Sequence, residues 1–128
     1  MSNITVTDVN AGSVELRDGE FEDALLDIAS AGTFPEGLIL ARSSEKLIPF
    51  IKGSNTAVAV LAHDVVAATS ADQPCRALIK GVVNLNRLVI LADGDASNVD
   101  ASVRDGLRSF GIVPLDVKQL SHNPADDS

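Results

Sequence analysis

Aromatic and sulfur-containing side chains are scarce in this sequence of 128 residues. It contains no Trp, no Tyr, four Phe and a single cysteine, Cys75. Aromatic platforms on which sugars or single-stranded bases could stack are therefore nearly absent. One cysteine cannot form an internal disulfide or a thiolate cluster, and the two distant histidines, His63 and His122, do not complete a structural zinc site. We expect no metal and no cofactor, and a fold that is stabilised by apolar packing.

Long apolar runs and positive charge are also lacking. The longest uninterrupted apolar stretch, residues 57–62, is too short to span a bilayer, and residues 1–10 lack the basic and apolar segments of a signal peptide. The net charge of −8 opposes binding to nucleic acid phosphates and to anionic membranes. We therefore expect a protein made in a cytoplasm, with neither nucleic acid nor a membrane as partner.

What the sequence does contain is enough apolar surface for one domain. Hydrophobic residues make up 45% of the chain, and a chain of this length buries roughly two thirds of its unfolded surface. The charge is uneven, with a net −7 over residues 1–36, +3 over residues 37–92 and −4 over residues 93–128. The central segment is also the most apolar, so we expect the core there, between two acidic segments.

Apolar periodicity predicts two short helices, over residues 21–31 and 98–110. Gly32 is expected to end the first helix, and Ser97 or Asn98 to cap the second. Their apolar stripes are Phe21, Ala24, Leu25 and Ile28 in the first, and Val99, Val103, Leu107 and Phe110 in the second.

Aliphatic and β-branched runs predict a larger number of strands. The expected strands cover residues 38–41, 47–51, 57–61, 76–84, 88–91 and 112–113. A short half-exposed strand is expected at Val14 and Leu16, a turn at Asp18-Gly19, and a loop over residues 67–74. The predicted fold class is α+β, a β-rich, compact, barrel-like domain with two short helices.

Candidate chemistry is weak throughout the sequence. His63-Asp64 could be a base with its orienting carboxylate in a small soluble enzyme, but no nucleophile signature accompanies it and a polar pair at a strand end is favoured. Lys80 could serve a carrier or adaptor module, although it lies inside a valine-rich strand rather than in a hairpin turn. Cys75 is expected to be a small buried filler rather than a reactive thiol beside Arg76.

Two acidic segments are further candidate sites. The segment that starts at Asp93 begins like a calcium loop but has Asn98 at the glycine position and Arg104 at the position of the bidentate glutamate. It is therefore expected to be a turn followed by a helix. The acids of the first predicted helix, Glu20, Glu22, Asp23 and Asp27, are expected to be solvated.

Five aliphatic segments follow one another along the chain: residues 37–41 (GLILA), 46–50 (KLIPF), 56–65 (TAVAVLAHDV), 77–84 (ALIKGVVN) and 107–113 (LRSFGIV). Their order and spacing resemble the lambda-type phage head decoration (capsid-stabilising) protein family. The resemblance implies a structural protein without catalysis that binds the outer surface of the expanded head. Its implied partners are the major capsid protein and further copies of itself, as a homotrimer on the capsid.

Three segments are expected along the chain. Residues 1–12 form an N-terminal extended arm, residues 13–118 the decoration domain, and residues 119–128 a flexible acidic tail. The arm is β-branched and separated from the domain by Ala11-Gly12-Ser13, so it could add a strand to a capsid sheet; a strand of the domain's own sheet is the open alternative. The expected capsid-binding residues are Ser2, Asn3, Ile4, Thr5, Val6, Thr7, Asp8 and Val9.

Overall fold

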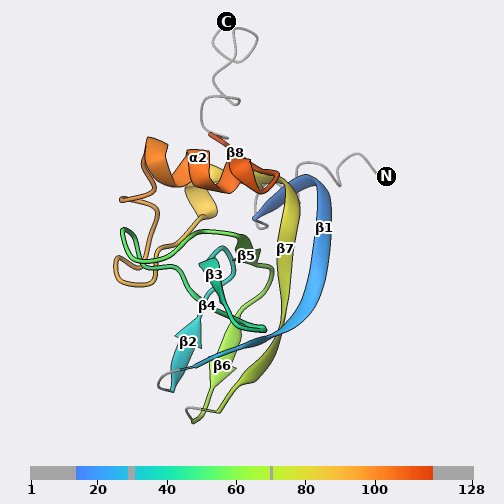
Figure 1. The fold of residues 1–128 in the computed structure, drawn as a ribbon, viewed down its shortest axis with the longest axis vertical. Coiled ribbons are helices and arrows are strands. Elements are labelled where there is room, and N and C mark those ends of the chain that lie inside the picture. Colours follow the sequence, from blue (N-terminus) through green and yellow to red (C-terminus); the bar gives the residue numbers. More distant parts are fainter. Residues whose placement is uncertain (1–13, 29–30, 70, 117–128) are drawn as a thin grey trace, which may run out of the picture.

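The computed structural model describes residues 14–28, 31–69 and 71–116 as a β-rich domain. The expected arm, residues 1–12, and the expected acidic tail, residues 119–128, lie outside the described residues. Residues 13, 117 and 118 of the expected domain also lie outside them. Eight strands, one 3₁₀ turn and one α-helix follow one another, as Figure 1 shows. They are β1 (Glu15–Leu26), β2 (Gly32–Phe34), β3 (Ile39–Ser43), β4 (Lys46–Pro49), β5 (Ala59–Leu61), β6 (Val65–Ala67), β7 (Gln73–Asn84), η1 (Leu85–Arg87), α2 (Ala101–Ser109) and β8 (Ile112–Leu115).

Six strands form one sheet in the order β1-β4-β3-β5-β7-β8, and β2 and β6 form a separate two-stranded sheet. The two long strands β1 and β7 also pair with each other, antiparallel, from Glu15↔Val83 to Leu26↔Gln73. The described part of β1 meets β4 at a single residue pair, Leu26↔Leu47. The prediction of a β-rich fold is confirmed. The barrel-like form stays a prediction, because the pairing of β1 with β4 that would close a barrel is a single residue pair.

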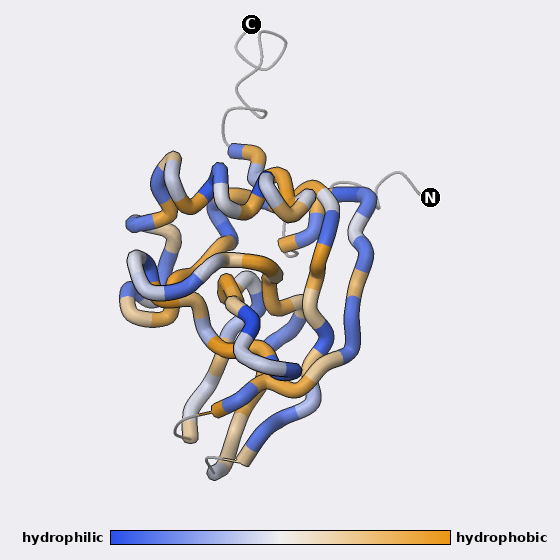
Figure 2. Tube along the Cα trace, viewed as in Figure 1, coloured by the Kyte–Doolittle hydropathy of each residue, from blue (hydrophilic) through white to orange (hydrophobic). Residues whose placement is uncertain are grey.

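The middle of the sheet, at β5, is buried on both faces, which explains the continuous apolar run of this segment. In β5, Val60 faces one hydrophobic cluster, whereas Ala59 and Leu61 face another. In β7, Leu78 joins the first cluster and Ala77 the second. Helix α2 covers the first cluster and the small β2–β6 sheet covers the second, so the hydrophobic residues run through the interior in Figure 2.

The predicted helix over residues 21–31 is wrong, because most of this segment belongs to β1 and β2 begins at Gly32. The same apolar residues satisfy a period of two, since Ala24, Leu26 and Ile28 alternate toward the second cluster. Leu25, which a helix would bury, is 44% exposed. Pairing with the twelve-residue strand β7 therefore outweighs the local helical pattern.

Helix α2 confirms the second helical prediction in a shorter form. Its N-cap is Asp100, whose side chain accepts a hydrogen bond from the Val103 amide, and not Ser97 or Asn98. Val103 and Leu107 are buried as expected, whereas Phe110 is 49% exposed. The chain then turns at Gly111, where φ is +89°, into β8, as the sequence predicts.

Three smaller predictions also need correction. Residues 88–91 form two single-residue bridges, Leu38↔Val89 and Ile90↔Asp95, instead of a regular strand. Asp18-Gly19 lies within β1 at an irregularity of the register, with Asp18 at a φ of 59°, and does not reverse the chain. The expected loop over residues 67–74 is shorter, because β6 and β7 extend into it.

Candidate interaction surface

His63 and Asp64 do not form a catalytic pair, because each side chain is engaged with backbone groups. The Arg76 amide donates to His63 Nε2 at 3.0 Å, and His63 Nδ1 lies 2.9 Å from the carbonyl oxygen of Asp64. Asp64 Oδ1 accepts a hydrogen bond from the amide of Glu36 at 2.7 Å. This region therefore joins the end of β5 to β7 and to the segment before β3, which is a structural role.

The other candidate groups are also placed for structure rather than chemistry. Burial raises the pKa of the Cys75 thiol, and the negative charges of Glu22 and Asp23 raise it further, so the thiolate is disfavoured. Lys80 is an exposed residue within β7, away from any hairpin turn. Its aliphatic carbons lie beside Gly111, which follows α2.

The segment at Asp93 turns the chain into the region before α2. The Asp95 carboxylate accepts hydrogen bonds from the side chain and the backbone amide of Ser97, which lower the pKa of Asp95. Within residues 14–28, 31–69 and 71–116, no three His, Cys, Asp or Glu side chains are grouped as a metal site would require. No helix in the same ranges is long and apolar enough to cross a membrane.

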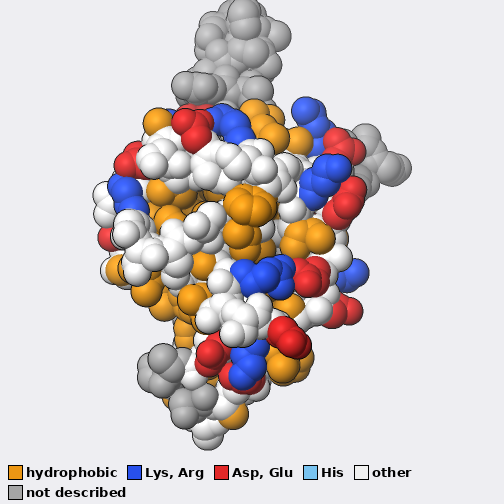
Figure 3. All heavy atoms as spheres, viewed as in Figure 1, with side chains coloured by type: hydrophobic (Ala, Val, Ile, Leu, Met, Phe, Trp, Pro, Cys, Tyr) orange, Lys and Arg blue, Asp and Glu red, His pale blue; other side chains and the backbone are white. Residues whose placement is uncertain are grey.

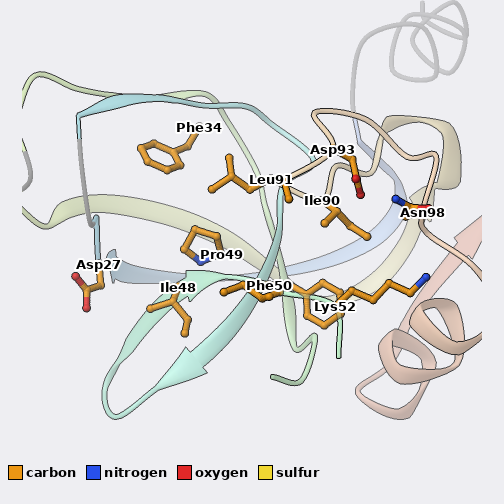
Figure 4. Close-up of a pocket in the computed structure, with 12 residues that line it drawn as sticks. Asp27, Phe34, Ile48, Pro49, Phe50, Lys52, Ile90, Leu91, Asp93 and Asn98 are labelled. Atoms are coloured by element: carbon orange, nitrogen blue, oxygen red, sulfur yellow. The ribbon is translucent and has the colours of Figure 1, made fainter. Parts of the chain in front are cut away.

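The described surface contains an apolar groove of about 690 Å³. Figure 4 shows its side chains, which converge from β2, β4 and the segments that follow β1, β4 and η1. The groove is lined by Asp27, Phe34, Ile48, Pro49, Phe50, Ile51, Lys52, Ile90, Leu91, Ala92, Asp93 and Asn98. Ile51 and Leu91 are 58% and 41% exposed, so the groove presents aliphatic surface to solvent.

An ion pair and a helix cap fix the wall of this groove. Lys52 Nζ lies 2.6 Å from Asp100 Oδ2, and Asp100 Oδ1 accepts from the Val103 amide at 3.1 Å. The hydrogen bond from Lys52 is the main cause that lowers the pKa of Asp100, and the amide of Val103 lowers it further. One carboxylate thus holds the segment after β4 against the start of α2.

A second, smaller hollow of about 410 Å³ lies between β1, β3 and β7, beside Phe110. It is lined by Glu22, Arg42, Val58, Ile79 and Phe110, and Arg42 Nη2 bonds Glu22 Oε1 at 2.8 Å. Figure 3 shows hydrophobic side chains in the middle and on the left of this face, and charged side chains along the right margin, where β1 runs.

The sequence did not predict the apolar groove. Ile51 and Leu91 end the predicted strands over residues 47–51 and 88–91, and each lies two or three positions before a glycine, Gly53 or Gly94. That position is the signal that could have suggested exposure. The predicted binding residues, Ser2–Val9, lie outside the described residues.

The sequence of residues 17–112 matches the family model of the bacteriophage lambda head decoration protein D. These residues are three quarters of the chain, and they run from β1 to the first residue of β8. The chain belongs to this family. The resemblance of its aliphatic segments to the phage head decoration family is therefore confirmed.

Membership makes this chain a phage decoration-family protein, a class of structural capsid proteins. The curated proteins contain no match to it. The engaged side chains of His63 and Asp64 agree with a structural role. For a protein of this class the functional site is an interaction surface, and the groove, the Phe110 hollow and the margin of β1 are its described candidates.

Proposed function

We propose that this protein is a capsid decoration, or cement, protein. It binds the outer surface of the expanded head and stabilises the lattice of the major capsid protein, without catalysis. The match of residues 17–112 to the head decoration family carries this proposal. The protein is made in the host cytoplasm and ends in the virion.

The N-terminal arm, residues 2–9, is proposed as the main attachment element. The described chain supports this through the position of its two ends. The carbonyl of Val14 accepts a hydrogen bond from the Asn84 amide, and Asp116 Oδ1 accepts from Asn86 Nδ2 at 3.1 Å. The arm before the domain and the tail after it therefore both join the domain beside Asn84–Asn86, so that one end of the molecule carries both.

Attached copies are proposed to form a homotrimer. Small domains hide exposed apolar surface in symmetric contacts, and this chain exposes Ile51 and Leu91 in the groove and Phe110 and Val113 near β8. A density map of the virion tests the assembly. Three copies in mutual contact are expected, and isolated copies that touch no sister subunit contradict the trimer.

Binding to the head is tested by sedimentation with expanded heads that lack a decoration protein. The full-length protein should sediment with these heads and raise their melting temperature. Unexpanded precursor heads are the control, and they should bind less of it. Equal binding to both kinds of head contradicts a role in clamping the expanded lattice, and a turnover that is lost on substitution of His63 contradicts the absence of catalysis.

Deletion of residues 2–9 tests the arm. The truncated protein should keep nearly the melting temperature of the full chain but lose binding to heads, because the described core begins at Val14. A loss of several kcal/mol in the free energy of unfolding would instead place this segment in the domain's own sheet.

A further inference from the structure

Within the described residues, strand β1 has one edge paired along its length and one edge that is largely without a strand partner. Its antiparallel partner β7 occupies one edge along almost its whole length. On the other edge, the described contacts with a strand are confined to its C-terminal end, where Leu26 pairs with Leu47 and the Asp27 amide donates to the Leu47 carbonyl at 2.8 Å. In Figure 1, β1 accordingly forms the outer margin of the molecule.

The register shows which backbone groups of β1 point to this free edge. The carbonyl of Arg76 in β7 accepts from the Ala62 amide at 2.9 Å, so Arg76 directs its backbone groups away from β1. Its register partner, Asp23, therefore directs its own N–H and C=O away from β7. By the same alternation Phe21, which is paired with Leu78, does so too.

The side chains along the free edge are predominantly acidic. β1 carries five carboxylates and one guanidinium, and β7 contributes only Arg76 and Lys80, so the two-stranded ribbon keeps a net charge of −2. Glu20 is exposed, and the Asp23 side chain is 91% exposed. Two copies of this edge repel each other, because like charges would face across the new pair, whereas a strand with Lys or Arg is attracted.

We propose that the free edge of β1 is a strand-addition site for an extended, basic segment of the major capsid protein. The added strand forms main-chain hydrogen bonds with Phe21 and Asp23, and its basic side chains face Glu20 and Asp23. The identity of the partner rests on the proposed function, whereas the site itself rests on the register and charge of β1. The arm would give a strand to the lattice, and this edge would receive one.

One substitution removes a backbone hydrogen-bond donor from the free edge of β1 and leaves the pairing of β1 with β7 in place. In Asp23→Pro, the lost N–H is one that β7 does not use, and proline is tolerated on edge strands. Asp23→Lys reverses the charge at the same position and also removes the ion pair of Asp23 with Arg76 of β7, whose atoms lie 3.9 Å apart. Glu45→Lys is the matched control, because Glu45 is an exposed acid in the β3–β4 turn.

A blocked peptide of alternating Lys and Val residues, titrated into the ¹⁵N-labelled full chain, tests the edge without capsids. Its binding should slow amide exchange at Phe21 and Asp23, and a peptide with Glu in place of Lys should not. The same exchange rates with both peptides, or no slowing at these two amides, would overturn the proposal. Melting temperatures of the variants confirm that each is folded.

Sedimentation with expanded heads then tests the partner. Binding should weaken about tenfold in Asp23→Pro and about fivefold in Asp23→Lys, but stay unchanged in Glu45→Lys. If the unsubstituted protein binds heads and folded Asp23→Pro binds equally well, the capsid strand at β1 is refuted while the proposed function stands. If the unsubstituted protein does not bind heads, the proposed function fails, and the peptide titration still decides whether the edge accepts a basic strand.

Discussion

Replacement of Gly37 by alanine should be among the most damaging single changes in this protein. Gly37 has a φ of +95°, and a Cβ on it would lie 1.9 Å from the carbonyl oxygen of Arg87. Because real Cβ contacts essentially never fall below 3.0 Å, the two segments must separate by about 1 Å. The blocking atom belongs to the backbone, so a side-chain rotation cannot relieve the clash.

The cost can be worked out from the contacts that this movement breaks. A side chain in left-handed backbone costs about 1–2 kcal/mol. The Gly37 amide donates to Leu61 at 2.9 Å and its carbonyl accepts from Val89 at 2.9 Å, and each such bond contributes about 1 kcal/mol. With the disturbed packing around the buried Leu38 and Leu88, we expect a loss of about 3–5 kcal/mol in the free energy of unfolding.

Gly53→Ala is the matched control for this prediction. Gly53 also has a left-handed φ, +83°, but its Cβ would meet no atom within 4 Å. Only the backbone cost of about 1–2 kcal/mol should therefore remain. Urea unfolding followed by circular dichroism measures both variants, and equal losses in Gly37→Ala and Gly53→Ala would refute the argument that contact with Arg87 sets the cost.

Other substitutions test the helix, the core and the wall of the groove. Gly106→Ala should raise the free energy of unfolding by about 0.5–1 kcal/mol, because Gly106 lies within α2 with open space for a Cβ; a loss contradicts this. Leu78→Ala should lower it by about 2–5 kcal/mol in urea unfolding, because Leu78 is fully buried. Since the pKa of Asp100 is lowered in the folded chain, its contribution is complete above the unfolded pKa and is lost as the pH falls below about 4. Asp100→Asn should therefore lower the melting temperature at pH 7 and reduce the fall of the melting temperature as the pH drops below about 4. An unchanged dependence of the melting temperature on pH in this range contradicts the role of the carboxylate.

Some elements could be predicted from the sequence because local and long-range forces agree there. Between Leu107 and Pro114 the helical stripe, the glycine stop and the short strand all point to the observed α2–β8 unit. In the segment that begins at Phe21 the apolar residues fit both a period of 3.6 and a period of two, and only the distant pairing with β7 decides between them. Sequence reasoning has no access to that pairing.

The same limit applies to the candidate surfaces. The groove joins Phe34, Ile48 and Leu91 from three distant segments, so no local pattern contains it. The free edge of β1 cannot be predicted for another reason, since the apolar pattern places its acids on the solvated side of a helix. By contrast, the absence of a nucleophile signature near His63 agreed with the engaged imidazole that the structure shows.

The glycine and asparagine positions that carried the family resemblance have structural reasons in this chain. Gly37 passes close to Arg87, and a Cβ on Gly81 would lie 2.8 Å from the Cα of Gly19. Asn84, the last residue of β7, is 5% exposed and is the buried polar residue of the described chain. At Gly37 and Gly81 neighbouring segments come too close for an ordinary side chain, and at Asn84 the side chain caps η1.

Asn84 offers the clearest test of these structural roles, because it lies between the first and last described residues, Val14 and Asp116. The side-chain Oδ1 of Asn84 accepts a hydrogen bond from the backbone amide of Asn86 at 3.0 Å and so caps η1. The backbone amide of Asn84 donates to the carbonyl oxygen of Val14. Asn84→Ala should lower the free energy of unfolding in urea by about 1 kcal/mol or more, because the buried side chain that caps η1 is lost. Asn84→Ser, which keeps an oxygen acceptor, should recover part of that loss and should slow amide exchange at Asn86 relative to the alanine variant. If alanine and serine have the same stability and the same exchange at Asn86, the side-chain oxygen does not hold this junction, and the geometry of the β7 backbone alone must position Val14 and Asp116.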